Sequence, residues 1–475
     1  MNPTSNSVSP ASFDGERRPT VMKFGGTSVQ DTAAFARVAA IARRQSARSP
    51  LPPVVVVSAM AGMTDALLEA VRQALEQDTA AALDGLEPHF ARYSEVAESL
   101  TGGAAYGDFV HALYAARERL AQALETMRAY PGTIPPLRDE VVAYGEQLAA
   151  TLLAAVIAGD GTACRAVDAR TCIVTDEVYG RARPRWEATV ARTRQALGPV
   201  LSAGVIPVLG GFIGATLDGA TTTLGRGGSD YSATLIGAAL QADEVQIWTD
   251  VAGIYSADPR LVARSRRLET LAYGEATDLA LYGAKVLHPR TIEPVERLKI
   301  PVSIRNSYDP DAGYSMITSV SGAPPGSILA VTHRPGIAAV HVRPAGGWLA
   351  ASALEEMARI LHAHGVLVEH LAASRLGLTA TVEQGDAIEA ARRDLASVGD
   401  VHLAADRALL CVVGNFGEDV ITLHPSLSEA LAAFQVTPLL PHPSAHARLF
   451  LMAETDAPPA VQALHARLVE PADTL

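Results

Sequence analysis

Two stretches of the chain place cations beside clustered glycines: "KFGG" (Lys23–Gly26) and "GRGGSD" (Gly225–Asp230). Glycine loses much conformational entropy on folding, so such a cluster needs a reason, and close approach of the backbone to a ligand is one. "GRGGSD" precedes an apolar run, and a helix starting there presents free N–H groups and a partial positive charge. Arg226 adds a planar fork that matches a carboxylate or a phosphate. The sequence thus favours an anion site, with a plain helix start and a solvent-facing arginine as the alternative.

The two charged residues Asp230 and Lys23 refine this interpretation. Ser229 and Asp230 can cap the following helix. A carboxylate repels an anion, so Asp230 makes sense if it pairs with lysines or holds magnesium near transferring phosphates. Lys23 comes before its glycines, and the Gly-x-x-x-x-Gly-Lys of a Walker P-loop is absent here. A mobile cation beside exposed backbone N–H groups suits a polyphosphate, while the alternative is a strand lysine next to an ordinary turn.

Further candidates for ligand contacts follow the next predicted strand. In "IWTDVAGIYSADPR", Thr249 and Asp250 end a strand, and Tyr255 and Arg260 follow in a turn-rich loop. A nucleotide could use such a loop for ribose, base and phosphate contacts, but the same residues also suit ordinary turns. "YGAKVLHP" adds Lys285 as a second candidate phosphate cation.

Two further titratable residues have both a functional and a structural interpretation. Glu146 lies in the otherwise apolar helical run "AYGEQL". A lone buried glutamate is costly unless it meets a cation, so Glu146 either receives an ammonium or is an exposed helical residue. His288 precedes Pro289 and is interpreted as structural.

The elements that position these residues alternate between strands and helices. Strand-like runs include "TVMKF", the β-branched "VVVV", "CRAVDA", "VIPVLGGFIG", "EVQIWTDV" and "IPVSIRN", and helical patterns separate them. Asp31 is a predicted N-cap of the first helix. This alternation predicts a mostly parallel sheet covered by helices on both faces. Ligands of such sheets bind beyond the carboxyl ends of the strands, where four glycine- or hydroxyl-bearing loops would converge.

The composition changes after a Pro/Gly/Ser-rich stretch, "SVSGAPPGS". The remainder reads as two rounds of strand and helix, each similar to a βαββαβ unit, which predicts an internal repeat of α+β domains. We expect a disordered tail over residues 1–19, a catalytic domain over 20–318, a linker over 319–329, and two smaller domains over 330–405 and 406–475 that may interleave.

Composition narrows the class of protein. The 475 residues are 48% apolar and 19% charged, with a net charge of −12 and no basic stripe, which argues against nucleic acid as a partner. Cys164, Cys172 and Cys411 lack disulfide or zinc spacing, which fits a reducing cytosol. We find no signal-peptide pattern and no run of about eighteen uninterrupted apolar residues, so we expect a cytoplasmic protein without a membrane span.

Several of these segments together resemble aspartate kinases (aspartokinases) of the monofunctional, lysine-sensitive type, which are amino-acid kinases with C-terminal ACT domains. The matching stretches are "KFGGTSV", "VVVVSAMAGMT", "VVAYGEQL", "GGFIGATLDGATTTLGRGGSDYSA", "IWTDVAGIYSADPR" and "YGAKVLHPRT". The resemblance implies the amino-acid-kinase fold followed by two ferredoxin-like ACT domains. It also implies transfer of the ATP γ-phosphoryl group to the β-carboxylate of L-aspartate, with Mg²⁺, at the entry to lysine, threonine and methionine synthesis.

The resemblance also implies roles for individual residues. Lys23 and Asp230 would act on the transferring phosphates, Arg226 would bind the substrate α-carboxylate, and Glu146 would receive its α-amino group. The other expected substrate contacts are Ser58, Thr64, Gly227, Gly228 and Ser229. The expected ATP contacts are Lys23, Phe24, Gly25, Gly26, Thr249, Asp250, Tyr255, Arg260, Lys285 and Val286. A homodimer or larger homo-oligomer is expected, and no residue is assigned as a direct metal ligand.

The first regulatory domain departs from the lysine-sensitive pattern. A Ser-Val-Asp-type turn and a Thr-Thr-Ser-Glu-type stretch are typical there, but this chain has "LVEH" and "AASR". The effector region that we single out consists of Leu367, Val368, Glu369, Ser374 and Arg375. We hypothesise that feedback by lysine is weakened, absent or redirected. The alternatives for the whole chain are a kinase acting on glutamate or acetylglutamate, and a catalytically silent amino-acid sensor.

Overall fold

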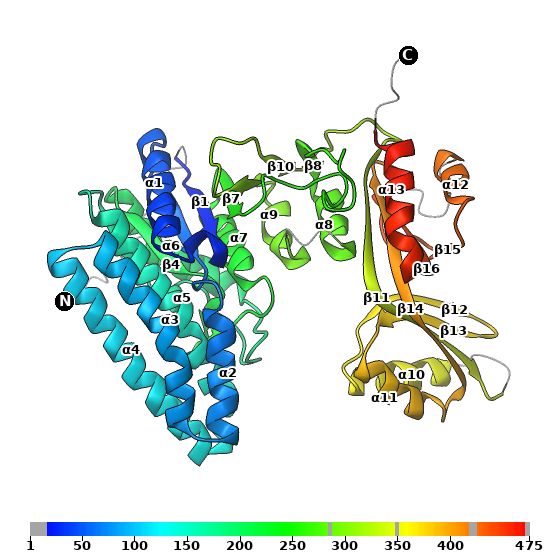
Figure 1. Ribbon diagram of the computed structural model, residues 1–475, viewed down its shortest axis with the longest axis horizontal. Helices are drawn as coiled ribbons and strands as arrows, with labels where there is room; N and C mark the ends of the chain where they lie inside the picture. The colour runs from blue at the N-terminus through cyan, green and yellow to red at the C-terminus, as the bar shows by residue number, and fades with distance from the viewer. Residues whose placement is uncertain (1–16, 284–286, 347–350, 418–424, 471–475) are drawn as a thin grey trace, which may run out of the picture. The chain divides into compact units, whose positions relative to one another are not determined.

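The computed structural model describes residues 17–283, 287–346, 351–417 and 425–470. These fall into two compact units (Figure 1). The first unit comprises Met1–Gly253 and Leu287–Ser319, and the second comprises Ile254–Val286 and Val320–Leu475. The segment Ile254–Val286, which the sequence analysis placed in the catalytic domain, therefore groups with the C-terminal part of the chain. The predicted tail lies almost entirely outside the described residues.

The first unit is built on a mostly parallel sheet in the order β3-β4-β2-β1-β7-β9-β10. All neighbouring strands in this order run parallel except β9 and β10, which are antiparallel. The strand bounds are β1 (Thr20–Phe24), β2 (Val54–Val57), β3 (Cys164–Ala166), β4 (Ile206–Gly210), β7 (Glu244–Thr249), β9 (Val302–Asn306) and β10 (Ser315–Thr318). The predicted run "VIPVLGGFIG" is interrupted, because β4 ends at Gly210 and a separate hairpin of β5 (Ile213–Ala215) and β6 (Thr221–Thr223) follows.

Helices cover both faces of this sheet. Successive side chains of β1 point to opposite faces and all of them are buried, so both faces must be covered. Met22 and Phe24 enter a core with the helices on one face, whereas Val21 faces Gly237 of α7 on the other. Asp31 caps the first helix as predicted, accepting a hydrogen bond from Ala34 N at 2.8 Å. The helices are α1 (Thr32–Arg48), α2 (Met63–Glu76), α3 (Thr79–Leu100), α4 (Gly103–Ala129), α5 (Ile134–Ala158), α6 (Trp186–Ser202), α7 (Gly228–Leu240) and α9 (Glu293–Glu296).

The helix α5 is apolar on all sides and central to the first unit. Among the described residues, the segment Pro131–Ala158 is long and apolar enough by composition to cross a membrane, and 78% of its most apolar window is buried inside the protein. A helix that is apolar all round and packed in this way is a core helix. It contacts α1, α2, α3 and α4 as well as β3 and β4, and it carries Glu146.

The second unit contains a sheet in the order β12-β13-β11-β14-β16-β15. Its strand pairs are all antiparallel. The bounds are β11 (Ile328–Pro344), β12 (Val368–Ser374), β13 (Gly377–Glu383), β14 (Gly399–Gly414), β15 (Thr437–Pro438) and β16 (Ala447–Ala453), with β8 (Thr270–Ala272) outside this sheet. The helices are α8 (Tyr273–Tyr282), α10 (Ala351–Ala363), α11 (Asp386–Leu395), α12 (Pro425–Leu431) and α13 (Ala457–Leu468).

Two long strands link the two α+β halves of this sheet. The first part of β11 (Ile328–Arg334) pairs with the last part of β14, and the second part (Ile337–Pro344) pairs with the first part of β14. One hydrophobic core is formed by residues between Ala338 and Leu395, and the other joins Val331 to residues between Ala408 and Val469. The second half thus takes a strand from the chain that precedes the first half, and the halves interleave. The predicted fold class, a parallel α/β part followed by antiparallel ACT-like domains, is confirmed.

Candidate active site

A cavity of about 480 Å³ in the first unit gathers most of the residues singled out from the sequence. It lies where β1 and β2 end and α7 begins, the edge of a parallel sheet at which ligands bind. The predicted residues that line it are Lys23, Gly26, Ser58, Thr64, Glu146, Arg226, Gly227, Gly228, Ser229 and Asp230. Segments that lie far apart in the sequence, from Lys23 to Asp230, therefore form one site.

Lys23 and Asp230 form an ion pair at the floor of this cavity. The Lys23 Nζ lies 2.7 Å from Asp230 Oδ1, and the two side chains are 11% and 15% exposed. Of the two roles that the sequence suggested for Asp230, pairing with a lysine or holding magnesium, the structure shows the first. The pair is nearly buried, so its charges are screened less by solvent than those of a surface ion pair.

The start of α7 differs from the prediction that Ser229 and Asp230 cap it. The N-cap is Gly227, which has a φ of +70° and makes no side-chain capping bond. Ser229 and Asp230 lie within the first turn, and the Asp230 carboxylate turns to Lys23 instead. Among the described residues, the N–H groups of Ser229 and Asp230 have no hydrogen-bond partner in the protein. These two donors and the helix dipole leave a site for an anion.

Arg226 stands at the mouth of the cavity on the loop that precedes α7. Its side chain is exposed, and no carboxylate of the described residues lies within ion-pair distance of it. His288 backs the same loop, since a Cβ placed on Gly227 would lie 2.5 Å from the Cβ of His288. His288 Nδ1 also accepts a hydrogen bond from Arg290 N, which agrees with a structural role. The guanidinium of Arg226 is thus presented to a ligand by a firmly packed loop.

Glu146 lines the same cavity and is buried, which excludes the interpretation of an exposed helical glutamate. The residue is 3% exposed, and its Oε2 atom has no hydrogen-bond partner among the described residues. Burial raises the pKa of Glu146 to about 8, although backbone N–H groups of Ala59 and Glu146 itself oppose the shift. Gly210 permits this approach of β4 to α5, because a Cβ there would lie 3.0 Å from Glu146 backbone atoms. A ligand cation is the partner that this carboxyl group lacks.

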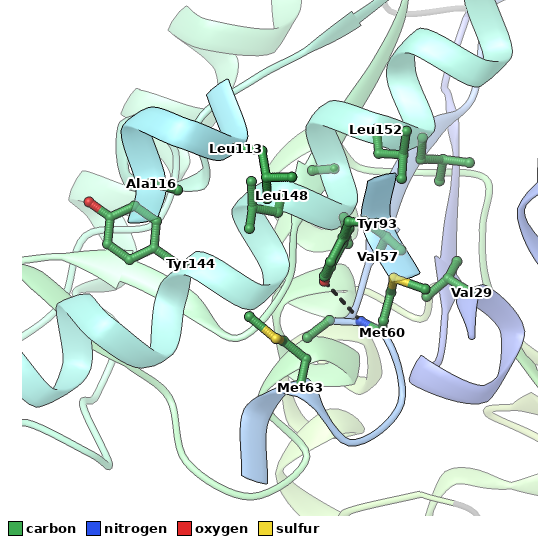
Figure 2. Packing of buried hydrophobic residues seen from close by; sticks show 14 of the residues in the cluster. Val29, Val57, Met60, Met63, Tyr93, Leu113, Ala116, Tyr144, Leu148 and Leu152 are labelled. Atoms are coloured by element: carbon green, nitrogen blue, oxygen red, sulfur yellow. Dashed lines mark hydrogen bonds between the residues drawn. The ribbon is translucent and has the colours of Figure 1, made fainter. Parts of the chain in front are cut away.

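Tyr93 positions the loop after β2 against Glu146, and sequence reasoning missed it. The Tyr93 hydroxyl donates to Gly145 O at 2.9 Å and accepts from Met60 N at 3.3 Å. Figure 2 shows this phenol directed at Met60 from within the hydrophobic cluster. In the sequence, a tyrosine on the apolar face of a helix cannot be told from any other core residue. Nothing near Tyr93 in the sequence indicated that its hydroxyl bonds to Met60 and Gly145.

Other lining residues were also missed. Met60, Ala61, Gly62, Asp65 and Phe212 border the cavity beside the predicted ones. Asp65 follows Thr64 in the first turn of α2, so its proximity to the predicted Thr64 was the available signal.

Some expected nucleotide contacts do not line this cavity. The Phe24 side chain is buried and stacks on Trp248, while its carbonyl accepts a hydrogen bond from Ser58 N. Gly25 N donates a hydrogen bond to Trp248 O, and Thr249 and Asp250 lie at the end of β7. Tyr255 and Arg260 belong to the second unit, where Arg260 forms an ion pair with Asp258. Lys285 and Val286 lie outside the described residues.

The effector region that we singled out lies at the edge strand β12 and the turn after it. Leu367 and Val368 are 69% and 42% exposed. The Glu369 carboxylate forms an ion pair with Arg334 at 2.8 Å. Ser374 Oγ accepts a hydrogen bond from Leu376 N, and Arg375 lies in the turn between β12 and β13. The acid that replaces the family's aspartate is therefore already neutralised by a neighbouring arginine.

The parts of the chain that the structure describes contain no group of three or more His, Cys, Asp or Glu side chains placed to hold a metal ion. The carboxyl groups that line the cavity are those of Asp65, Glu146 and Asp230, and Glu146 is the one assigned to a ligand ammonium. This set fits a magnesium ion that takes most of its ligands from phosphates and water, which is how Mg²⁺ usually binds at kinase sites.

Comparison with known proteins agrees with this geometry. Residues 18–306 match the amino acid kinase family. The chain is 32% identical over 467 residues to lysine-sensitive aspartokinase 3 of Escherichia coli, covering 95% of this chain and 99% of that protein. The structure superposes on E. coli aspartokinase III in complex with aspartate and ADP with a TM-score of 0.81 at 29% identity, over 95% of this chain and all of the other.

A second crystal structure of the same E. coli enzyme, in complex with lysine and aspartate, gives a TM-score of 0.80 at 30% identity, again over 95% of this chain and 100% of that chain. Family, length and fold all correspond over nearly the whole chain. The chain therefore belongs to the amino acid kinase family and, within it, to the aspartokinases.

Proposed function

We infer that this chain is an aspartate kinase, which transfers the γ-phosphoryl group of ATP to the β-carboxylate of L-aspartate and yields 4-phospho-L-aspartate and ADP. This reaction is the entry step to lysine, threonine and methionine synthesis. The observation that carries the inference is that one cavity is lined by two complementary groups: the buried carboxyl group of Glu146, whose Oε2 atom has no hydrogen-bond partner among the described residues, and the exposed guanidinium of Arg226, which has no ion-pair partner among them. Such a pair suits the two charges of an α-amino acid.

Each end of the substrate has a complementary group in this proposal. Glu146 receives the α-ammonium and Arg226 binds the α-carboxylate, while Ser58 and Thr64 complete the pocket. The β-carboxylate then faces the start of α7, where the N–H groups of Ser229 and Asp230 await an anion. A substrate held at both ends has its reacting carboxylate oriented before the phosphoryl group arrives, which lowers the entropic part of the barrier.

The chemistry needs no general base. An aspartate side chain has an unperturbed pKa near 3.9, so its carboxylate is ionised at neutral pH and can attack directly. A carboxylate oxygen forms the new bond to the γ-phosphorus, the bond from that phosphorus to the β–γ bridging oxygen breaks, and ADP leaves with the electron pair. Lys23 stabilises the charge spread over the transferring oxygens, and Asp230 holds the Lys23 ammonium in place.

The nucleotide contacts extend this proposal. We assign ATP to Lys23, Gly25 and Gly26 together with Thr249, Asp250, Tyr255, Arg260, Lys285 and Val286, as the resemblance implies. Asp230 is the acidic group that would help to hold a magnesium ion bound with the nucleotide, and such an ion would supply positive charge that neutralises the phosphates. We propose a cytoplasmic location, a homodimer or larger homo-oligomer, and a catalytic part over 20–318 followed by regulatory domains over 330–405 and 406–475.

Regulation by lysine is proposed to be weak, absent or redirected to another effector. The ion pair between Glu369 and Arg334 supports this, because a carboxylate already neutralised by an arginine attracts a lysine ammonium less. Activity titrations with lysine, with threonine and with both together test it. Strong inhibition by lysine alone contradicts the proposal.

A coupled assay of ADP release with a panel of acceptors tests the function. We expect turnover with L-aspartate far above that with L-glutamate or N-acetyl-L-glutamate, and trapping with hydroxylamine should give aspartate β-hydroxamate. A preference for glutamate or acetylglutamate would identify another amino-acid kinase. No turnover with any acceptor, while amino acids still bind, would identify a sensor.

A further inference from the structure

A buried carboxylate outside the cavity, that of Asp139, holds the loop that carries Arg226. Asp139 is 1% exposed on α5, and its Oδ2 accepts hydrogen bonds from Thr223 N and Gly180 N, each at 2.8 Å. Buried carboxylates are rare unless they are paired, and here the partners are backbone donors from two different segments. The only nearby cation among the described residues is Arg138, at 4.0 Å from Oδ1.

The two segments that Asp139 joins form the base of the loop before α7. Thr223 ends β6, and its carbonyl accepts from Ala182 N at 2.9 Å. Gly225 packs against the other segment, because a Cβ there would lie 3.2 Å from Gly180 O. Arg226 is the next residue. Asp139 therefore fixes both sides of the support from which the guanidinium projects.

Neighbouring bonds make this support rigid. Leu224 N donates to Phe212 O at 2.9 Å, and Leu224 O accepts from Arg290 at 3.3 Å. The hydroxyls of Thr221 and Thr222 bond to Arg170 and Thr175. A displacement at Thr223 is thus transmitted along the loop, because each backbone group around it is already held.

Asp139 shares its helix with Glu146, two turns or about 10 Å further along the axis. One rigid helix therefore carries both the carboxyl group that faces the cavity and the carboxylate that anchors the opposing arginine loop. Aspartate and glutamate carry the same α-ammonium and α-carboxylate groups, so the Glu146 and Arg226 contacts alone do not distinguish them. What distinguishes them by length is how far the group bound at Arg226 lies from the phosphoryl site at Lys23 and Asp230, and the anchoring of the arginine loop to α5 fixes that position.

We propose that Asp139 is a positioning residue that fixes Arg226 relative to Glu146 and to the phosphoryl site at Lys23 and Asp230, and thereby sets the preference for the four-carbon aspartate over the five-carbon glutamate. The proposal rests on the function inferred above. Asp139 touches no substrate and acts through the loop. Its loss removes the acceptor of two N–H groups, that of the buried Thr223 and that of the half-buried Gly180, and frees the loop to shift. We expect this shift to affect binding of the amino acid and not of the nucleotide.

The test compares full-length Asp139→Ala and Asp139→Asn with wild type in the coupled ADP assay. For Asp139→Ala we expect the KM for aspartate to rise at least tenfold, the KM for MgATP to stay within twofold, and the aspartate-to-glutamate ratio of kcat/KM to fall at least fivefold. Asp139→Asn keeps an acceptor oxygen in the same place, so we expect a smaller shift of the aspartate KM, of at least threefold.

A matched control separates positioning from general destabilisation. Thr193 is fully buried in α6, and its hydroxyl donates to Cys172 O at 3.1 Å, away from the loop. Thr193→Val should lower the melting temperature without changing either KM or the substrate ratio. If the Asp139 variants behave like this control, with unchanged KM and ratio, the positioning role is overturned. If Asp139→Ala does not fold, the test rests on whether Asp139→Asn raises the KM for aspartate at least threefold.

The outcome also distinguishes this proposal from the proposed function. A wild-type chain without aspartate-dependent turnover removes both. An active wild type whose Asp139→Asn variant keeps the wild-type KM for aspartate removes only the positioning role.

Discussion

Aspartate binding should weaken steeply as the pH falls below 8, because Glu146 must lose a proton to receive the substrate ammonium. In the ligand-free protein, burial raises the Glu146 pKa to about 8, so the carboxyl group is mostly protonated at neutral pH. An ammonium next to the partnerless Oε2 favours the ionised form and lowers this pKa in the complex. The charges of free aspartate do not change over the same pH range.

The size of the effect follows from linkage. The apparent dissociation constant is multiplied by one plus the ratio of protonated to ionised Glu146 in the free protein. With a free pKa of about 8 and a complexed pKa below about 5, binding is roughly fifty-fold weaker at about pH 6 than at about pH 8. At about pH 7, each aspartate that binds releases roughly 0.9 proton.

Isothermal titration of aspartate at these three pH values, in two buffers of different ionisation enthalpy, measures both quantities. Glu146→Gln should bind aspartate weakly, release no proton, and lose the pH dependence. His288 packs behind the loop that carries Arg226, and burial and the nearby arginines Arg290 and Arg226 lower its pKa from the ordinary value. His288→Gln should therefore keep the steep profile. An affinity that is constant within twofold from pH 6 to pH 8 in wild type, or an unchanged slope in Glu146→Gln, would refute the reasoning.

Three further predictions follow from the same cavity. The ligand-free protein should lose thermal stability as the pH rises from about 5 to about 8. The pKa of Glu146 is raised in the folded state, so the stabilising contribution of the protonated carboxyl group is lost on ionisation, a change of roughly 3–5 kcal/mol in the free energy of unfolding. Glu146→Gln should flatten this melting profile, and a wild type that melts at the same temperature throughout would contradict the prediction. Lys23→Ala should lower kcat roughly 100- to 1000-fold in the ADP assay, since it removes a preorganised charge at the transferring phosphates, and a near-normal rate would exclude that role. Gly227→Ala should lower the free energy of unfolding in urea by more than about 1–2 kcal/mol, because the added Cβ crowds His288 and the backbone, with φ +70°, is strained for alanine. Gly219→Ala is the control, because this position has φ +89° and open space around it, so the substitution adds the backbone strain alone. An equal loss of stability in both variants would exclude the crowding.

The parallel sheet and most of the cavity could be predicted because their signals are local. The run Val54–Val57 is a continuous β-branched strand, and it is fully buried in the centre of the sheet. Glycines and cations at strand ends marked Lys23, Gly26 and the loop before α7, and the topology of an α/β sheet brings such ends together. Chemistry and spacing therefore located the cavity without any knowledge of contacts.

The features that escaped prediction depend on partners far away in the chain. The preference of aspartate for N-cap positions favoured Asp230 as a cap, but an ion pair with Lys23 from β1 overrides it. Nothing in the sequence marked the hydroxyls of Thr221 and Thr222, which bond to Arg170 and Thr175. A linker was expected over residues 319–329, yet β11 begins at Ile328, because pairing with β14 extends the strand into it.

The exchange of strands between the halves of the second unit has a consequence for how the chain is synthesised. The first part of β11 leaves the ribosome about seventy-five residues before its β14 partner and well over a hundred before α13, with which it shares a core. Until those residues are made, Ile328–Arg334 is a strand with unpaired backbone groups, which invites pairing with other chains. Termination before Gly414 would leave that edge permanently open, and termination between Gly414 and α13 would leave the core of the second half incomplete. The last helix to be translated therefore completes a core whose first strand was made long before, so messages that end early should yield aggregating chains and not shorter working enzymes.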